Sequence, residues 1–144
     1  MKILKILTEE KKTPTKKIDT VKGWIPLSKD YDPDPSHLSP ISFPVSRIII
    51  SYPLTTEAVV EGEVETVKDL IELTRWGYRE VYRIEEETTE KPAQRLCDEV
   101  PGCTLLNRNR TSGEFGIWGH VMEDLVVHTW EIYDDGTVRL GVDS

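Results

Sequence analysis

Residues 66–87 read Thr-Val-Lys-Asp-Leu-Ile-Glu-Leu-Thr-Arg-Trp-Gly-Tyr-Arg-Glu-Val-Tyr-Arg-Ile-Glu-Glu-Glu. Thr66 followed three residues later by Asp69 is typical of a capping box, with the carboxylate near the positive end of the helix. Seven side chains then follow the three- and four-residue spacing of one helical stripe: Val67, Leu70, Ile71, Thr74, Tyr78, Val81 and Tyr82. This pattern predicts a helix of about 20 residues, ~30 Å long, which is enough to cross a sheet.

Gly77 is the weak point of this helix, because glycine inside a helix costs roughly 1 kcal/mol relative to alanine. The apolar stripe keeps its phase through Gly77, so the pattern favours one continuous helix over 66–87. The alternative is a helix that ends at Gly77 and is followed by a strand.

The strands of the sheet are predicted on both sides of this helix. Residues 47–52 are short, β-branched and closed by Pro53, as in a central strand. Residues 2–7 fit a short strand, and residues 57–65 fit an extended arm. At the C-terminal end, Asp134-Asp135-Gly136 predicts a three-residue turn that closes a hairpin. Its register pairs Ile132 with Val138, Glu131 with Arg139, Trp130 with Leu140 and His128 with Val142. One apolar face results: Val126, Trp130, Ile132, Val138, Leu140 and Val142.

A second hairpin is expected just before it, over 103–110 and 114–120. Thr111-Ser112-Gly113 would be its three-residue loop, with Gly113 in the left-handed conformation. In that register Arg110 faces Glu114 and Arg108 faces Gly116. Strand alternation then places eight side chains on one face: Thr104, Leu106, Arg108, Arg110, Glu114, Gly116, Trp118 and His120. Asn107, Asn109, Phe115 and Ile117 fall on the other face.

This hairpin is the strongest candidate for a binding surface. Arg108 and Arg110 carry the fork-shaped donors that suit a carboxylate or phosphate, although a solvated Arg110–Glu114 pair explains them equally well. Gly116 weakens a strand unless something approaches the backbone there. The candidate ligand-binding residues are therefore Asn107, Arg108, Arg110, Gly116 and Trp118. The glycines of 113–119 do not form a phosphate loop, because the Gly-Lys-Ser/Thr ending is missing.

The segment 8–45 contrasts with the rest of the chain because six prolines fall within it. Proline removes backbone donors and restrains its predecessor, so we expect a long irregular segment that wraps on the body or is loosely attached to it. Pro92 suits the first turn of a short helix over 92–99. Together these elements predict a single domain over 1–144 of the α+β class. Its mostly antiparallel sheet has one long helix packed across it, and two consecutive hairpins form the C-terminal half.

Charge and hydropathy exclude several classes of protein. The net charge is −8, yet residues 1–24 hold seven lysines against three acidic residues, which leaves −12 on the remainder. An acidic body repels phosphates, so nucleic acid is not an expected partner, whereas a protein or a small anionic ligand is. No apolar run reaches the ~18 residues of a membrane span, and no signal peptide is recognisable. We therefore expect a soluble, cytoplasmic protein that does not bind membranes.

Metal and cofactor sites are not expected. Cys97 and Cys103 lack two further ligands at zinc spacing and fit half-buried thiols. His128 falls on the apolar face of the last hairpin and is expected to be a core histidine. Four glutamates, Glu85, Glu86, Glu87 and Glu90, end the long helix. A solvated face is the expected role of these glutamates. The alternative is a cation site, which is disfavoured because carboxylates at a helix C-terminus repel its negative end.

His120 with Asp124 is the one pair that suits acid–base catalysis. A histidine close to a carboxylate can accept or donate a proton near neutral pH. A histidine and a carboxylate also occur together by chance in most domains, which weakens the catalytic interpretation. His120 lies on the same predicted face as Trp118. A separation above ~7 Å between the two side chains would exclude direct or single-water contact.

Several short stretches resemble a family of small intracellular proteins of unknown activity. They are Ser51-Tyr52-Pro53-Leu54, Gly77-Tyr78, Tyr82, Asn107-Arg108, Thr111, Gly113, and Gly116-Ile117-Trp118-Gly119-His120 with Asp124-Leu125. The family block reads Tyr-Gly-Ile-Trp-Gly-His-Asp; here Phe115 replaces the tyrosine and Val121 the aspartate. The resemblance covers about 50–144 and implies no activity, cofactor or partner.

Three hypotheses about function follow from the sequence. The first is a small binding or regulatory module whose ligand or partner contacts the face of Arg108, Trp118 and His120. The second is a small hydrolase or transferase that uses His120 with Asp124, with the two arginines holding an anion. The third is a purely structural block, with Trp118 and His120 buried under the long helix.

Overall fold

The computed structural model describes residues 2–8, 16–89 and 111–144. Its strands are β1 (Ile3–Ile6), β2 (Lys17–Pro26), β3 (Arg47–Ile50), β4 (Ala58–Glu61), β5 (Val126–Tyr133) and β6 (Thr137–Asp143). Its helices are the long α1 (Val67–Thr88) and two short 3-10 turns, η1 (Pro35–Leu38) and η3 (Met122–Asp124). The predicted helix 92–99 and both cysteines lie outside these residues. No helix among the described residues combines the length and apolar character needed to cross a bilayer.

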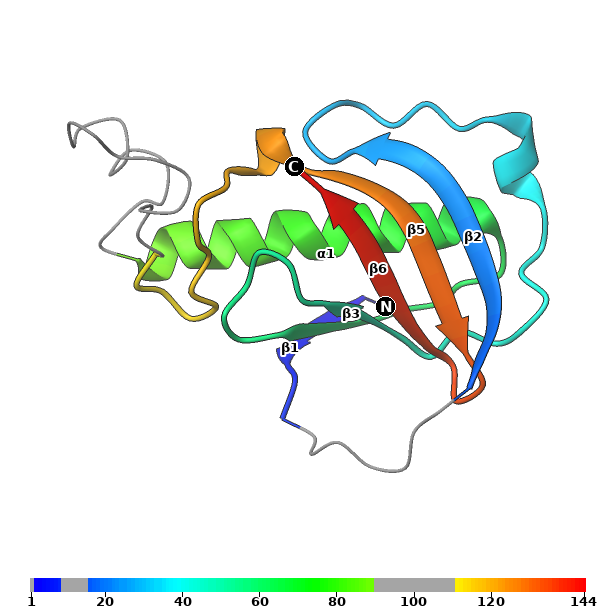
Figure 1. Ribbon diagram of the computed structural model, residues 1–144, viewed down its shortest axis with the longest axis horizontal. Coiled ribbons are helices and arrows are strands. Elements are labelled where there is room, and N and C mark those ends of the chain that lie inside the picture. Colours follow the sequence, from blue (N-terminus) through cyan, green and yellow to red (C-terminus); the bar gives the residue numbers. More distant parts are fainter. Residues whose placement is uncertain (1, 9–15, 90–110) are drawn as a thin grey trace.

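The six strands form one mixed sheet in the order β1-β4-β3-β6-β5-β2. Every neighbouring pair is antiparallel except β3 and β6, which run parallel. The single long helix α1 lies across the sheet (Figure 1). The α+β class with a mostly antiparallel sheet and one helix packed on it is therefore confirmed.

Helix α1 begins where the sequence predicts. Thr66 accepts a hydrogen bond from the Asp69 N–H at 3.2 Å, and the Asp69 carboxylate accepts from the Thr66 N–H at 3.1 Å and from the Glu65 N–H at 3.0 Å. The first two bonds form the predicted capping box, and all three satisfy N–H groups that have no partner inside the helix. The Glu65 and Thr66 N–H donors lower the pKa of Asp69, because they stabilise its charged form.

Gly77 lies inside the helix, so the continuous helix is confirmed and the alternative of a break is wrong. A Cβ at this position would lie 2.5 Å from the Val60 Cγ2 atom on β4 and 3.0 Å from the Ile50 Cδ1 atom on β3. Real Cβ atoms do not approach so closely. The weak helix former is therefore required for contact between the helix and the centre of the sheet.

The segment 8–45 is only partly irregular. Residues 17–26 form β2, a ten-residue edge strand paired with β5, so the expectation is wrong there. Pro26 is the last residue of this strand, so it does not interrupt the ladder. The following residues fold against α1, where the Arg75 guanidinium donates to the Lys29 carbonyl and lies 5.6 Å above the Tyr31 ring.

The last hairpin is confirmed in its turn and in most of its register. Gly136 has a φ of 85°, and Glu131 pairs with Arg139 as expected. Beyond Thr129 the pairing shifts by one residue, so Val127 and not His128 lies opposite Val142. This bulge turns Val127 into the core in place of Val126.

The bulge also removes His128 from the apolar core, so the expected core histidine is wrong. Its ring stacks on the exposed Trp24 of β2 at 6.4 Å between centroids. Its Nδ1 lies 2.7 Å from the Thr129 hydroxyl. The imidazole of His128 therefore has its stacking and polar contacts outside the core.

Gly77→Ala is predicted to destabilise the protein, although alanine is the better helix former. The new methyl group must displace Val60, and such overpacking costs about 1–3 kcal/mol, which exceeds the roughly 1 kcal/mol gained in helix propensity. Urea unfolding measures the free energy of unfolding of both proteins. In a Val60→Ala background the same substitution should cost clearly less, because the clashing methyl is gone. An increase in stability on Gly77→Ala would contradict the close approach.

Candidate functional site

Glu85, in the last turn of α1, is the centre around which the predicted binding stretch folds. It is 2 % exposed, although it belongs to the glutamate group that was expected on a solvated face, so that expectation is wrong for Glu85. Its carboxylate accepts hydrogen bonds from the backbone N–H groups of Gly113 at 2.8 Å, Phe115 at 2.7 Å and Gly116 at 3.3 Å. The Thr111 hydroxyl donates to the same carboxylate. Four donors surround a charge that would be very costly to bury alone.

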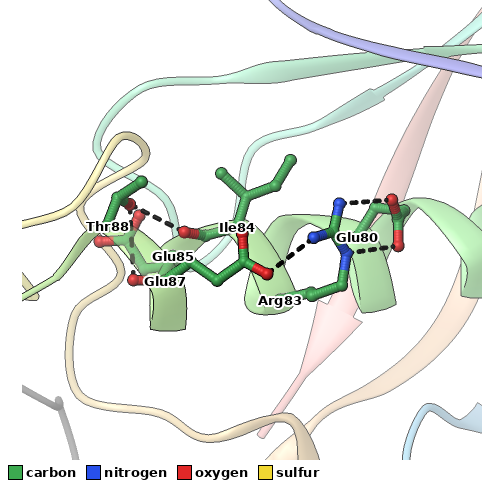
Figure 2. Close-up of polar contacts among 6 residues, drawn as sticks. All are labelled: Glu80, Arg83, Ile84, Glu85, Glu87 and Thr88. Carbon is green, nitrogen blue, oxygen red and sulfur yellow. Dashed lines mark hydrogen bonds and ion pairs between the residues drawn. The ribbon is translucent and has the colours of Figure 1, made fainter.

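The other side of the helix end shows what the exposed glutamates do. Figure 2 shows the Arg83 guanidinium between the carboxylates of Glu80 and Glu87. Arg83 Nε lies 3.1 Å from Glu80 Oε2, and Arg83 Nη1 lies 3.0 Å from Glu87 Oε1. The hydrogen bonds from Arg83 lower the pKa of Glu80. Glu80 and Glu87 therefore belong to a solvated ion-pair network with Arg83, whereas Glu85 is buried.

The stretch around Glu85 is a closed loop and not the second strand of a hairpin. The Thr111 N–H donates to the Ile117 carbonyl at 2.6 Å, and the Ile117 N–H donates to the Thr111 hydroxyl at 2.8 Å. Thr111 therefore lies opposite Ile117, so the predicted three-residue turn Thr111-Ser112-Gly113 is wrong, and the predicted pair of Arg110 with Glu114 involves a residue outside the described ones. Gly113 does not adopt the left-handed conformation either, whereas Gly116 does, with a φ of 63°. The strand expected over 103–110 lies outside the described residues, and 114–120 contributes no strand to the sheet.

Two glycines make room for this arrangement. A Cβ on Gly113 would lie 2.6 Å from Glu85 Oε2 and 2.5 Å from Thr88 Oγ1. Gly116 is buried, and its carbonyl accepts from the Thr55 hydroxyl at 2.8 Å while its N–H points at Glu85. The close approach that the sequence predicts at Gly116 is thus made by the protein's own side chains.

The segment after β3 holds the opposite side of the loop. The Thr55 N–H donates to the Phe115 carbonyl at 3.1 Å, and the Trp118 N–H donates to the Pro53 carbonyl at 3.2 Å. The Phe115 and Ile117 side chains turn into the core, where both are buried. The loop is therefore fixed by α1 on one side and by residues 52–56 on the other.

Three rings meet where these two segments adjoin, and we call Tyr52, Trp118 and His120 the aromatic corner. The Trp118 ring stands edge-on to the Tyr52 ring, with 5.7 Å between centroids and 78° between planes. The His120 ring lies 5.5 Å from Tyr52 and 6.4 Å from Trp118. The Trp118 side chain remains 43 % exposed, so the hypothesis that buries it under the helix is wrong for Trp118.

His120 and Asp124 are brought together, as the catalytic hypothesis requires. His120 Nδ1 lies 3.4 Å from Asp124 Oδ2, which is far below the limit of ~7 Å for direct or single-water contact. The geometry of this contact is not that of a hydrogen bond. The Tyr52 hydroxyl lies 2.8 Å from His120 Nε2. We assign the tautomer that serves both neighbours, with the Nδ1 proton directed at Asp124 and Nε2 accepting from Tyr52.

Two tyrosines of α1 anchor the backbone of the aromatic corner. The Tyr78 hydroxyl donates to the Tyr52 carbonyl at 2.7 Å, and the Tyr82 hydroxyl donates to the His120 carbonyl at 3.0 Å. Burial raises the pKa of both phenols, so they remain donors throughout the physiological range. Tyr78 and Tyr82 belong to the helical stripe that packs on the sheet, and through these bonds they hold the backbone of Tyr52 and His120.

The structure unites only part of the predicted site. Gly116, Trp118, His120 and Asp124 lie within one region, whereas Asn107, Arg108 and Arg110 fall outside the described residues. Sequence reasoning missed Tyr52 and Glu85. The burial of Glu85 could have been predicted, because this residue continues the three- and four-residue spacing of Tyr78, Val81 and Tyr82 on the helix face that packs on the core. In the described part of the chain, no three His, Cys, Asp or Glu side chains converge as metal ligands would.

The chain has no significant similarity to a family model, a curated protein or a solved structure. The resemblance over about 50–144 therefore stays a prediction.

Glu85→Ala is predicted to cost about 3 kcal/mol or more of unfolding free energy, because it leaves three backbone N–H groups and one hydroxyl without their acceptor. Glu85→Gln keeps one acceptor oxygen and should cost about 1–3 kcal/mol. Guanidinium unfolding provides the measurement. The matched control is Glu86→Ala, an exposed neighbour expected to change stability by less than about 0.5 kcal/mol. Equal effects at 85 and 86 would contradict the structural role of Glu85.

Proposed function

We propose that the protein is a small binding or regulatory module whose partner contacts the aromatic corner. The observation that carries the proposal is the exposure of Trp118 on a loop that is otherwise tightly held. Its neighbours Phe115 and Ile117 are buried, and Trp130 in the core is 1 % exposed, whereas Trp118 is 43 % exposed. A large apolar ring left in water costs free energy that a partner can recover by covering it, and tryptophan is enriched where partners bind most strongly.

The way in which the loop is held favours binding as well. Glu85 and Thr55 fix the backbone on both sides of the indole. A ring presented on an ordered loop loses little conformational entropy on association, which improves affinity without further contacts.

Trp118→Ala is predicted to abolish capture of the partner from a cell extract by the immobilised protein. The matched control is Trp24→Ala, because Trp24 is an even more exposed indole, at 62 %, and it lies on β2 outside the aromatic corner. We expect the control to retain whatever the unsubstituted protein captures. Identical sets of captured proteins from all three baits would refute this surface as the binding site.

Acid–base catalysis is the second candidate, and the proximity of His120, Asp124 and Tyr52 favours it. In the assigned tautomer, Asp124 lies beside the Nδ1 proton of the imidazole and Nε2 can accept a proton from the Tyr52 hydroxyl. His120 is mostly buried, with a side chain 11 % exposed, so a substrate would approach through the Tyr52 hydroxyl.

This candidate predicts hydrolysis of activated nitrophenyl esters or phosphates above the buffer rate. His120→Ala should lower that rate about 100-fold or more, in line with the usual contribution of a general base. His128→Ala is the control, because His128 lies on β5 against Trp24 and not at the aromatic corner. A rate unchanged in His120→Ala would exclude the chemistry.

A further inference from the structure

The charged group that the described residues place at the aromatic corner is a carboxylate. Asp124 and Glu123 belong to η3, directly after His120, and both of their negative charges contribute to the raised pKa of Tyr82, after burial and the neighbouring Tyr78. Asp143 adjoins Ser144, whose hydroxyl lies 3.2 Å from the Tyr52 hydroxyl. Of these carboxylates, Asp124 lies against the aromatic corner, with its Oδ2 3.4 Å from His120 Nδ1, while Glu123 and Asp143 are neighbours in the chain of Asp124 and Ser144.

These carboxylates have no cationic partner of their own within residues 2–8, 16–89 and 111–144, apart from the His120 ring beside Asp124. Glu123 and Asp143 are exposed, and the Asp124 side chain is 37 % exposed. The described lysines and arginines that lie over aromatic rings are Lys2 at Trp76 and Arg75 at Tyr31. Among the described residues, no cation is recorded over the Trp118 ring, and the Asp124 carboxylate contacts the neighbouring His120 ring.

An exposed indole next to unpaired carboxylates attracts a cation for two independent reasons. The electron-rich face of tryptophan is the best of the aromatic rings for a cation–π contact. The carboxylates add a Coulomb attraction and can accept hydrogen bonds from the same group. A planar guanidinium can make both the cation–π contact and the hydrogen bonds to carboxylates, because it stacks on a ring and donates from its edge. An ammonium group does not stack.

We propose that the aromatic corner binds an arginine side chain of a protein partner, with the guanidinium stacked on Trp118 and its N–H groups directed at the carboxylates of η3. The proposal rests on the proposed function and names the chemistry of its partner. The sequence pattern of Arg108 and Arg110 predicts an anionic ligand, whereas this proposal predicts a cationic one, because the charged group that the described residues place at this site, Asp124, is negative. A partner of this kind would carry an exposed arginine in a basic segment.

The test uses the full chain labelled with ¹⁵N and two capped pentapeptides, Gly-Gly-Arg-Gly-Gly and the same peptide with citrulline. Citrulline has the shape of arginine and no charge. The Trp118 indole N–H signal, assigned with Trp118→Phe, should shift and saturate with the arginine peptide. The citrulline peptide should bind about threefold more weakly or worse, because it loses the cation–π contact and the charge pairing.

Two controls make the result specific. The Trp24 indole, exposed but stacked on His128 and close in sequence to Lys22, should not shift with either peptide. Asp124→Asn keeps an oxygen for the Val121 N–H and should weaken the arginine peptide about twofold or more, and added salt should act in the same direction.

Equal binding of the arginine and citrulline peptides would overturn the proposal, and so would preferential binding of a glutamate peptide, which the anionic-ligand hypothesis predicts. Neither result would remove the binding function if Trp118→Ala still loses the captured partner while Trp24→Ala retains it. Failure of the ligand class and failure of the proposed function therefore remain distinguishable.

Discussion

The buried carboxylate of Glu85 is the constraint on which the rest of this site depends. Its hydrogen-bond donors come from residues 26 to 31 positions further along the chain. The carboxylate of one side chain thus accepts bonds from loop N–H groups that a neighbouring strand would accept in a sheet. Buried backbone N–H groups must find acceptors, and a charged acceptor makes the stronger bonds. The positions of Trp118 and His120 follow from this interaction, because both lie within a few residues of the loop that it closes.

Helix α1 connects the stability of the core to the geometry of the site. Its first half packs on the sheet through Leu70 and through Thr74, whose hydroxyl accepts from the Trp130 indole at 3.0 Å. Its second half directs Tyr78, Tyr82 and Glu85 at the backbone around the aromatic corner. Because these groups share one stripe of one rigid element, a change in how the helix sits on the sheet would move the whole site.

Several features were predictable because their signals are local or periodic. The capping box at Thr66, the continuous stripe through Gly77 and the turn at Gly136 all depend on residues that are neighbours in the sequence. The ten-residue β2 was missed because the prolines around it masked its own strand pattern, and the shift at His128 was missed because a bulge carries no strong sequence signal. At the site, the proximity of His120 to Asp124 was foreseen, whereas Tyr52 reaches His120 from 68 residues away.

The sequence by itself determined the α+β class, the length and start of the helix, and the turn and most of the register of the last hairpin. Tertiary structure alone decided that residues 111–120 form a closed loop and that its aromatic residues meet Tyr52. The physical reason is the range of the interactions. Caps, stripes and turns bring together residues a few positions apart, whereas the conformation of this loop depends on where a distant carboxylate finds the donors that allow it to remain buried.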